Sequence, residues 1–254
     1  MDMRLRDRVV LVTGGASGIG RACAEAVTAE GSKVVIVDRD QEGFSVSHEL
    51  MQKGHEAEFI HADVTDEADV ARCIQAARDR LGQLDAVIAC AGISGPVGTS
   101  AADVAAADWD RVMAVNVRGN FLVAKHAIPV LKRSDAPAVV FLASDSALVA
   151  FEGMAPYSTS KGAVLMLTKA LAVDHPEIRF NCLCPGIVDT PMSRTDLGHP
   201  DGFEGTGLPV TQPRQIAAHA VFLVSPVSAP INGTSIVADH GYLARSAQPA
   251  LNFS

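Results

Sequence analysis

The stretch Val9-Val10-Leu11-Val12-Thr13-Gly14-Gly15-Ala16-Ser17-Gly18-Ile19-Gly20 decides the fold class. An apolar, β-branched run leads into a glycine-rich turn, and Arg21-Ala22-Cys23-Ala24 then fits the start of a helix. The backbone N–H groups of such a turn can approach a pyrophosphate, whose charge the helix N-terminus stabilises. Gly14 would permit the tight turn, Gly18 the close approach and Gly20 the packing of helix on strand. The stretch predicts a dinucleotide-binding unit; the alternative is an ordinary glycine-rich loop.

The rest of the chain repeats the alternation of a short apolar run with a longer amphipathic one. Because repeated βαβ units pair their strands in parallel, this order predicts an α/β fold with a doubly wound seven-stranded parallel sheet and helices on both faces. We find no linker or composition shift, so one domain is expected over residues 1–254. Strands are expected at 8–12, 33–37, 57–61, 84–89, 138–143, 179–183 and 234–238, and helices at about 18–30, 41–53, 66–81, 103–133, 157–174 and 213–224, with Thr65 or Asp66 capping the third.

Composition excludes several classes of partner. The 254 residues include 29 acidic and 21 basic side chains, a net charge of −8, which argues against binding to nucleic acid or to an anionic membrane surface. No apolar run reaches the ~18 residues of a membrane span, and the charged N-terminal residues do not resemble a signal peptide. The five scattered cysteines fit a reduced, cytoplasmic protein, and Cys182 and Cys184 lack a third ligand nearby, so no metal is expected.

The ends of the next three strands supply the expected contacts to the rest of a dinucleotide. Asp38 can accept hydrogen bonds from the adenosine ribose and would repel a 2′-phosphate, which favours NAD over NADP; Arg39 would partly offset that repulsion. The alternative interpretation makes Asp38 a simple turn residue. Asp63 and Val64 are expected near the adenine ring. The small residues Cys90, Ala91 and Gly92 are expected to let the backbone pass close to the cofactor.

Tyr157 and Lys161 form the candidate acid/base pair. Four residues separate them in a predicted helix, so both lie on one face. A lysine ammonium near a phenol favours the phenolate and would bring a pKa of ~10 toward neutrality. The alternative is an ordinary surface pair on an amphipathic helix.

Two further polar residues are placed to assist. Ser144 ends the fifth strand and is expected to hold the substrate oxygen, with Ser146 as a rival for that role. Asn116 lies inside an apolar helical stretch, where it would break the local hydrogen-bond ladder and hold a water near Lys161. It is otherwise a buried amide with its hydrogen bonds satisfied.

With these residues in place, the whole chain resembles the short-chain dehydrogenase/reductase family. The matching motifs are Thr13-Gly14…Gly18-Ile19-Gly20, Asp38, Asp63, Asn116, Ser144, Tyr157/Lys161 and Pro185-Gly186. The resemblance implies a Rossmann-type domain and a catalytic tetrad of Asn116, Ser144, Tyr157 and Lys161. It also implies cofactor contacts from Gly14, Ser17, Gly18, Ile19, Gly20, Asp38, Arg39, Asp63, Val64, Cys90, Ala91, Gly92, Asn116, Tyr157, Lys161, Pro185, Gly186, Val188 and Thr190.

In that family Tyr157 would be the acid/base and Ser144 would orient the substrate oxygen. Lys161 would lower the pKa of the phenol and bind the nicotinamide ribose, and Asn116 would anchor a relay water. The chain departs from the family at Cys90, where an Asn is usual, and at His240, where a glycine is usual. The segment from about 190 to 212, rich in Gly and Pro, is expected to be a lid over the substrate.

The resulting expectation is an oxidoreductase that transfers a hydride between NAD and a small secondary alcohol or ketone. Two alternatives stay open: an NADPH-dependent carbonyl reductase, and a catalytically silent dinucleotide-binding sensor. The pocket is expected to accept a small polar alcohol, hydroxy acid or polyol. By resemblance a homotetramer is expected, assembled through the helices at 103–133 and 157–174 and the last strand. Candidate pocket residues are Ser94, Val97, Ser146, Glu152, Met154, Val188 and Met192.

Overall fold

The computed structural model describes residues 2–245, and one parallel sheet organises them. Its strands run in the order β3-β2-β1-β4-β5-β6-β7, and every pairing is parallel. This confirms the predicted doubly wound sheet of seven strands. The order reverses between β1 and β4, which is where such sheets open a crevice for ligands. The strands are β1 (Val9–Thr13), β2 (Lys33–Asp38), β3 (Ala57–His61), β4 (Ala86–Ala89), β5 (Ala138–Leu142), β6 (Arg179–Pro185) and β7 (Ser235–Ala238).

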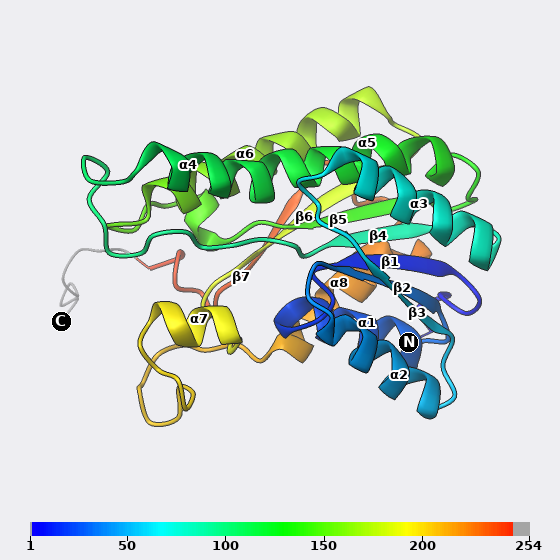
Figure 1. The fold of residues 1–254 in the computed structure, drawn as a ribbon, viewed down its shortest axis with the longest axis horizontal. Coiled ribbons are helices and arrows are strands. Elements are labelled where there is room, and N and C mark those ends of the chain that lie inside the picture. The colour runs from blue at the N-terminus through cyan, green and yellow to red at the C-terminus, as the bar shows by residue number, and fades with distance from the viewer. Residues whose placement is uncertain (1, 246–254) are drawn as a thin grey trace, which may run out of the picture.

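Helices cover both faces of the sheet (Figure 1). On one face lie α1 (Gly18–Ala29), α2 (Glu42–Gln52) and α8 (Pro213–Val224), and on the other α3 (Glu67–Leu81), α5 (Asn120–Leu131) and α6 (Ala155–Asp174). The alternation of side chains along β1 shows why both are needed: Val10 and Val12 enter one apolar core, whereas Val9 and Leu11 enter the other. A strand buried on both faces has to be apolar throughout.

Helix α3 shows how the sequence pattern becomes structure. Asp66, not Thr65, caps it, with its carboxylate accepting hydrogen bonds from the N–H groups of Ala68 and Asp69. The helix ends at Gly82, which takes the left-handed conformation with φ of 85°. Its buried side chains recur at three-and-four spacing and pack on the sheet: Val70, Cys73, Ile74 and Ala77.

The region expected to form one helix over 103–133 is divided into three parts. Helix α4 (Ala106–Met113) passes into a π-helical segment, Ala114–Gly119, before α5 begins. The side-chain amide of Asn120 donates to the Asn116 carbonyl at 2.6 Å, and the Asn116 side chain bonds outside the helix. Such π segments are frequent at functional sites, and this one positions Asn116.

The segment 190–212 contains a short helix that the sequence pattern did not predict. Helix α7 (Pro191–Asp196) begins with a capping box, in which Thr190 and Ser193 bond each other's backbone N–H groups. The two ends of the segment are held together, because Val188 and Thr211 form an isolated parallel bridge. The segment is therefore anchored at its base and extends beside the carboxyl ends of the strands.

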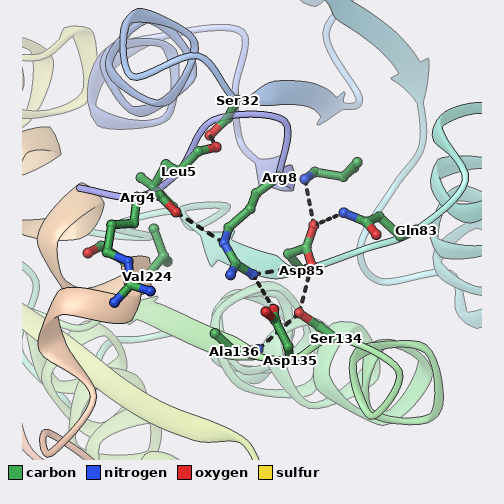
Figure 2. Close-up of polar contacts among 12 residues, drawn as sticks. Arg4, Leu5, Arg8, Ser32, Gln83, Asp85, Ser134, Asp135, Ala136 and Val224 are labelled. Atoms are coloured by element: carbon green, nitrogen blue, oxygen red, sulfur yellow. Dashed lines mark hydrogen bonds and ion pairs between the residues drawn. The ribbon is translucent and has the colours of Figure 1, made fainter. Parts of the chain in front are cut away.

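At the opposite, amino edge of the sheet, a buried carboxylate joins the starts of three strands. Asp85, 3% exposed, accepts hydrogen bonds from the Val9 N–H at 2.8 Å, Gln83 Nε2 at 2.7 Å and Ser134 Oγ at 2.6 Å. Arg8 approaches it at 3.5 Å and pairs with Asp135 at 2.9 Å (Figure 2). This network satisfies the hydrogen-bonding capacity of the Asp85 carboxylate, at the edge of the sheet opposite the carboxyl ends of the strands.

Candidate active site

A cavity of about 630 Å³ opens at the carboxyl ends of the central strands. The cofactor-contacting residues predicted from the sequence all line it except Asn116, which is fully buried behind it. Ser144, Tyr157 and Lys161 line the same cavity. The fold thus brings together side chains from strand ends that lie far apart in the sequence.

The cradle formed by the glycine-rich turn packs so closely on neighbouring backbone that no larger residue fits at Gly14 or Gly20. Gly14 has a φ of +67°, and a Cβ added to it would lie 2.8 Å from the Ala91 nitrogen. A Cβ on Gly20 would lie 2.0 Å from the Gly14 carbonyl oxygen. Helix α1 begins at Gly18 with no acidic residue in its first turn, and Ser17 makes no side-chain capping bond. Its first N–H groups are therefore available to an anion, which fits the pyrophosphate of a dinucleotide.

Asp38 is tied to this turn. Its Oδ2 accepts a hydrogen bond from the Ala16 N–H at 3.0 Å, and its Oδ1 accepts one from the Asp40 N–H at 3.0 Å. Arg39 is exposed and also lines the cavity. A carboxylate held between the glycine turn and the end of β2 fits the ribose of a dinucleotide.

The ends of β3 and β4 form the next part of the wall. Asp63 accepts hydrogen bonds from both the N–H and the hydroxyl of Thr65 at 2.8 Å, so its carboxylate organises the turn before α3. The Ala91 N–H donates to Thr13 Oγ1 at 3.2 Å. Cys90, in the place of the family's usual Asn, packs against the apolar core that contains Cys23. The departure at Cys90 thus replaces a polar group with an apolar contact.

Tyr157 and Lys161 both project from the first turns of α6. The Lys161 ammonium lies 5.4 Å from the centre of the Tyr157 ring and donates to the Leu142 carbonyl at 2.8 Å. Burial raises the pKa of Tyr157 to about 12, against a hydrogen bond with Ser144 that lowers it. Burial lowers the pKa of Lys161 to about 8. Loss of water around both groups therefore outweighs the expected lowering of the phenol pKa in the cofactor-free protein.

Ser144, rather than Ser146, is the serine bonded toward Tyr157. Its hydroxyl donates to Asp145 Oδ1 at 2.8 Å and accepts from the Ser146 N–H at 3.2 Å. Burial raises the pKa of the Asp145 carboxyl, which also lines the cavity. Sequence reasoning overlooked Asp145, although its position directly after a strand-end serine was a usable signal.

The side-chain oxygen and nitrogen of Asn116 both form hydrogen bonds within the protein. Its Oδ1 accepts from the Ile93 N–H at 2.8 Å, and its Nδ2 donates to the Ile93 carbonyl at 2.8 Å and to Ser160 Oγ at 2.9 Å. Gly92 lies between this amide and Lys161: a Cβ there would be 3.3 Å from Asn116 Oδ1 and 3.5 Å from Lys161 Nζ. Asn116 thus fixes the loop after β4, and a water on its side chain stays a prediction.

The end of β6 and the segment after it close the cavity. Pro185, Gly186, Val188 and Thr190 line it, but the Thr190 hydroxyl accepts from the Ser193 N–H and caps α7. Among the candidate pocket residues, Val97, Ser146, Met154, Val188 and Met192 line the cavity, whereas Ser94 and Glu152 do not.

The structure gives three residues roles that the sequence did not predict. Asp196 at the end of α7 lines it and was not anticipated, because the helix that carries it was not. Ser94 acts indirectly, since its hydroxyl donates to Asp196 at 3.0 Å. His240 has a φ of +56°, the conformation that favours the glycine usual in the family, and its ring bonds Thr211 at 3.1 Å.

Across the described residues, no helix has both the length and the apolar character needed to span a bilayer. The same residues contain no cluster of three or more His, Cys, Asp or Glu side chains placed to hold a metal ion.

Comparison with known proteins agrees with this geometry. Residues 14–243 match the family model described as enoyl-(acyl carrier protein) reductase. The chain is 35% identical to 2-(R)-hydroxypropyl-CoM dehydrogenase of Xanthobacter autotrophicus, over 93% of this chain and 99% of that one. It is 34% identical to cyclopentanol dehydrogenase of Comamonas testosteroni, over 95% and 99%.

Among solved structures, 3-ketoacyl-(acyl-carrier-protein) reductase of Brucella melitensis, complexed with NADH, superposes with a TM-score of 0.85 at 34% identity. The match covers 93% of this chain and 98% of that one. The family uses a nicotinamide dinucleotide, and the cradle at Gly14 and the carboxylate of Asp38 fit one. The chain belongs to the short-chain dehydrogenase/reductase family of oxidoreductases.

Proposed function

We propose that this chain is an NAD-dependent oxidoreductase that interconverts a small secondary alcohol and its ketone. The observation that carries the proposal is the meeting of Ser144, Tyr157 and Lys161 in one cavity that Asp38 also lines. Two relatives are named as dehydrogenases of alcohols, which supports this reaction class. When bound, the nicotinamide accepts or supplies the hydride at the carbinol carbon.

In the proposed mechanism Tyr157 moves the proton of the substrate oxygen. With its pKa at about 12 the phenol is protonated near neutral pH, so it is ready to donate to a ketone oxygen. In the oxidative direction it must take up a proton, and the positive charge of Lys161, 5.4 Å from the ring, favours the phenolate. Ser144 hydrogen-bonds the same oxygen, and Asp145 fixes the orientation of the serine hydroxyl.

Asp38 supports a preference for NAD over NADP. Its two oxygens already accept the Ala16 and Asp40 N–H groups, so the carboxylate is held at the cavity wall where a ribose 2′-phosphate would meet a negative charge. The neighbouring Arg39 is the feature that favours NADPH, because its side chain is exposed and unbonded to Asp38. A fluorescence titration with NADH and NADPH decides between them: we expect tighter binding of NADH, and equal or tighter NADPH contradicts the assignment.

The test of the reaction is formation of NADH from NAD⁺ with a panel of small secondary alcohols and polyols. Tyr157→Phe removes the phenolic proton and is expected to lower kcat by about 1,000-fold or more while NADH affinity stays the same. Full activity in this variant would contradict the assignment of the acid/base. Tight NADH binding without turnover of any alcohol would favour the sensor alternative.

We also propose a cytoplasmic homotetramer made of single-domain chains, with the segment 190–212 as a lid. All five cysteines are free, as suits a reducing compartment. Apolar side chains stay exposed on the surfaces expected to associate: Phe121 on α5, Met166 and Val173 on α6, and Val237 on β7. Light scattering on the eluting protein is expected to give four times the chain mass, and a monomer would contradict the assembly.

A further inference from the structure

The substrate end of the cavity is negatively charged. Beside apolar side chains such as Phe151, Met154 and Met192, it is lined by the carboxylates Asp145 and Asp196. Of the described residues, the cations lining the cavity are Arg39, next to Asp38, and Lys161, whose ammonium is bonded to the Leu142 carbonyl. Within the described residues, a substrate bound beyond Tyr157 therefore meets two carboxylates that form no ion pair.

Asp196 accepts fewer side-chain hydrogen bonds than Asp145 does. Its Oδ1 accepts a hydrogen bond from Ser94 Oγ at 3.0 Å, and within residues 2–245 its Oδ2 has no hydrogen-bond partner. Asp189, seven residues earlier, contrasts with it, because Arg194 binds that carboxylate at 2.6 and 3.1 Å. None of the ion pairs in the described chain includes Asp196.

The position of Asp196 relative to the reacting groups makes this free oxygen relevant to the substrate. Beside burial, the charges of Asp145 and Asp196 raise the pKa of Tyr157, so both carboxylates lie within electrostatic range of the phenol. Ser94, in the loop after β4, holds Asp196 in place through its direct hydrogen bond. A half-buried carboxylate with one free oxygen, in a mostly apolar wall, attracts hydrogen-bond donors and repels anions.

We propose that Asp196 is a specificity-determining residue that binds a hydrogen-bond donor of the substrate, a second hydroxyl or an ammonium, and excludes alcohols that carry a carboxylate. This inference rests on the proposed function and narrows its substrate class to polyols and amino alcohols. It removes the hydroxy acids that the sequence alone left open.

The test compares four alcohols of equal length that differ only at the end remote from the reacting carbon. These are 2-pentanol, 1,3-butanediol, 4-amino-2-butanol and 3-hydroxybutyrate. For the unaltered chain we expect kcat/KM to be about 100-fold higher for the diol and the amino alcohol than for the hydroxy acid. Equal use of 3-hydroxybutyrate would overturn the proposal.

The variant Asp196→Asn removes the charge and keeps an acceptor for Ser94. It is expected to narrow the gap between diol and hydroxy acid to about 10-fold, with 2-pentanol changed by less than about 3-fold. Asp201→Asn is the matched control, because Asp201 is an exposed carboxylate of the same segment that does not line the cavity. An unchanged ratio in Asp196→Asn, or the same change in the control, would overturn the proposal.

Failure of the proposed function has a different signature. In that case none of the four alcohols yields NADH, and calorimetric titration of the NADH-loaded chain with 4-hydroxy-2-butanone and acetoacetate decides the inference instead. We expect Asp196→Asn to bind acetoacetate about 10-fold more tightly than the unaltered chain does, and to bind the hydroxyketone with the same or lower affinity. Unchanged acetoacetate affinity would overturn the inference.

Discussion

At the amino edge of the sheet, Asp85 is buried with a backbone N–H, an amide and a hydroxyl all donating to it, and with Arg8 beside it. At the carboxyl edge, Asp145 is buried with the Ser144 and Ser146 hydroxyls as its side-chain partners and faces a cavity. Asp85 lies directly before the central strand β4, and Asp145 lies shortly after the central strand β5. The first joins strands through complete hydrogen bonding; the second is left able to respond to a ligand.

This difference follows from the direction of a parallel sheet. All strands begin at one edge, where short turns can be closed by side-chain bonds such as those of Asp85 and Ser134. All strands end at the other, where longer connections leave room for α7 and the cavity. Variants at the two edges should therefore separate activity from stability.

The largest expected effect is on activity at the carboxyl edge. Lys161→Met removes the cation beside Tyr157 and is expected to lower kcat by about 1,000-fold. The free energy of unfolding near pH 7 should not fall, because a buried ammonium without a carboxylate partner is itself costly. Steady-state kinetics and urea unfolding measure the two effects. A variant that loses stability in proportion to activity would break the comparison.

At the amino edge we expect the opposite result, a loss of stability without a loss of activity. Asp85→Ala leaves the Val9 N–H, Gln83 and Ser134 without their acceptor and is expected to lower the free energy of unfolding by about 3 kcal/mol. The kcat and KM of the folded fraction should stay unchanged. Asp135→Ala is the control, since Asp135 is exposed and solvent screening leaves its pair with Arg8 little effect on stability. Loss of turnover by folded Asp85→Ala would show that the edges are coupled.

The pH dependence of stability sharpens the comparison at the carboxyl edge. The pKa of Lys161 is about 8 in the folded chain and ~10.4 when unfolded, so between these values the unfolded state binds more protons and stability rises with pH. From about pH 7.5 to about pH 10 we expect the unfolding free energy of the unaltered chain to rise by about 2 kcal/mol relative to Lys161→Met.

Above about pH 10 the sign changes, because the pKa of Tyr157 is about 12 in the folded chain and ~10 when unfolded, so the folded state then binds more protons. Urea unfolding without cofactor across this range is the measurement. Parallel pH curves for the two proteins would contradict the assigned cause.

The smallest effect tests whether position at the carboxyl edge is enough to make a carboxylate functional. Asp66 lies near that edge but caps α3 through the Ala68 and Asp69 N–H groups. Asp66→Ala is expected to cost about 1 kcal/mol of stability with kcat unchanged. If kcat falls instead, the division between structural and functional carboxylates at this edge is wrong.

Much of this arrangement is readable from local sequence. The apolar run from Val9 and the glycine turn after it require a buried strand followed by a helix start, and Tyr157 and Lys161 share a face because four residues separate them in a helix. Helix α7 is too short for a periodic signal, and the π segment at Asn116 depends on bonds to Ile93 and Ser160 that no local pattern contains.

The sequence by itself determined the parallel α/β fold and the glycine-rich turn, and it predicted the candidate acid/base pair, because periodicity, turn chemistry and helical spacing are local properties of the chain. Only the tertiary structure decided which serine bonds toward Tyr157, which way burial shifts the pKa values of Tyr157 and Lys161, and that Asp145 and Asp196 line the cavity. These depend on desolvation and on distances between segments as far apart as Ser94 and Asp196, which exist only once the chain is folded.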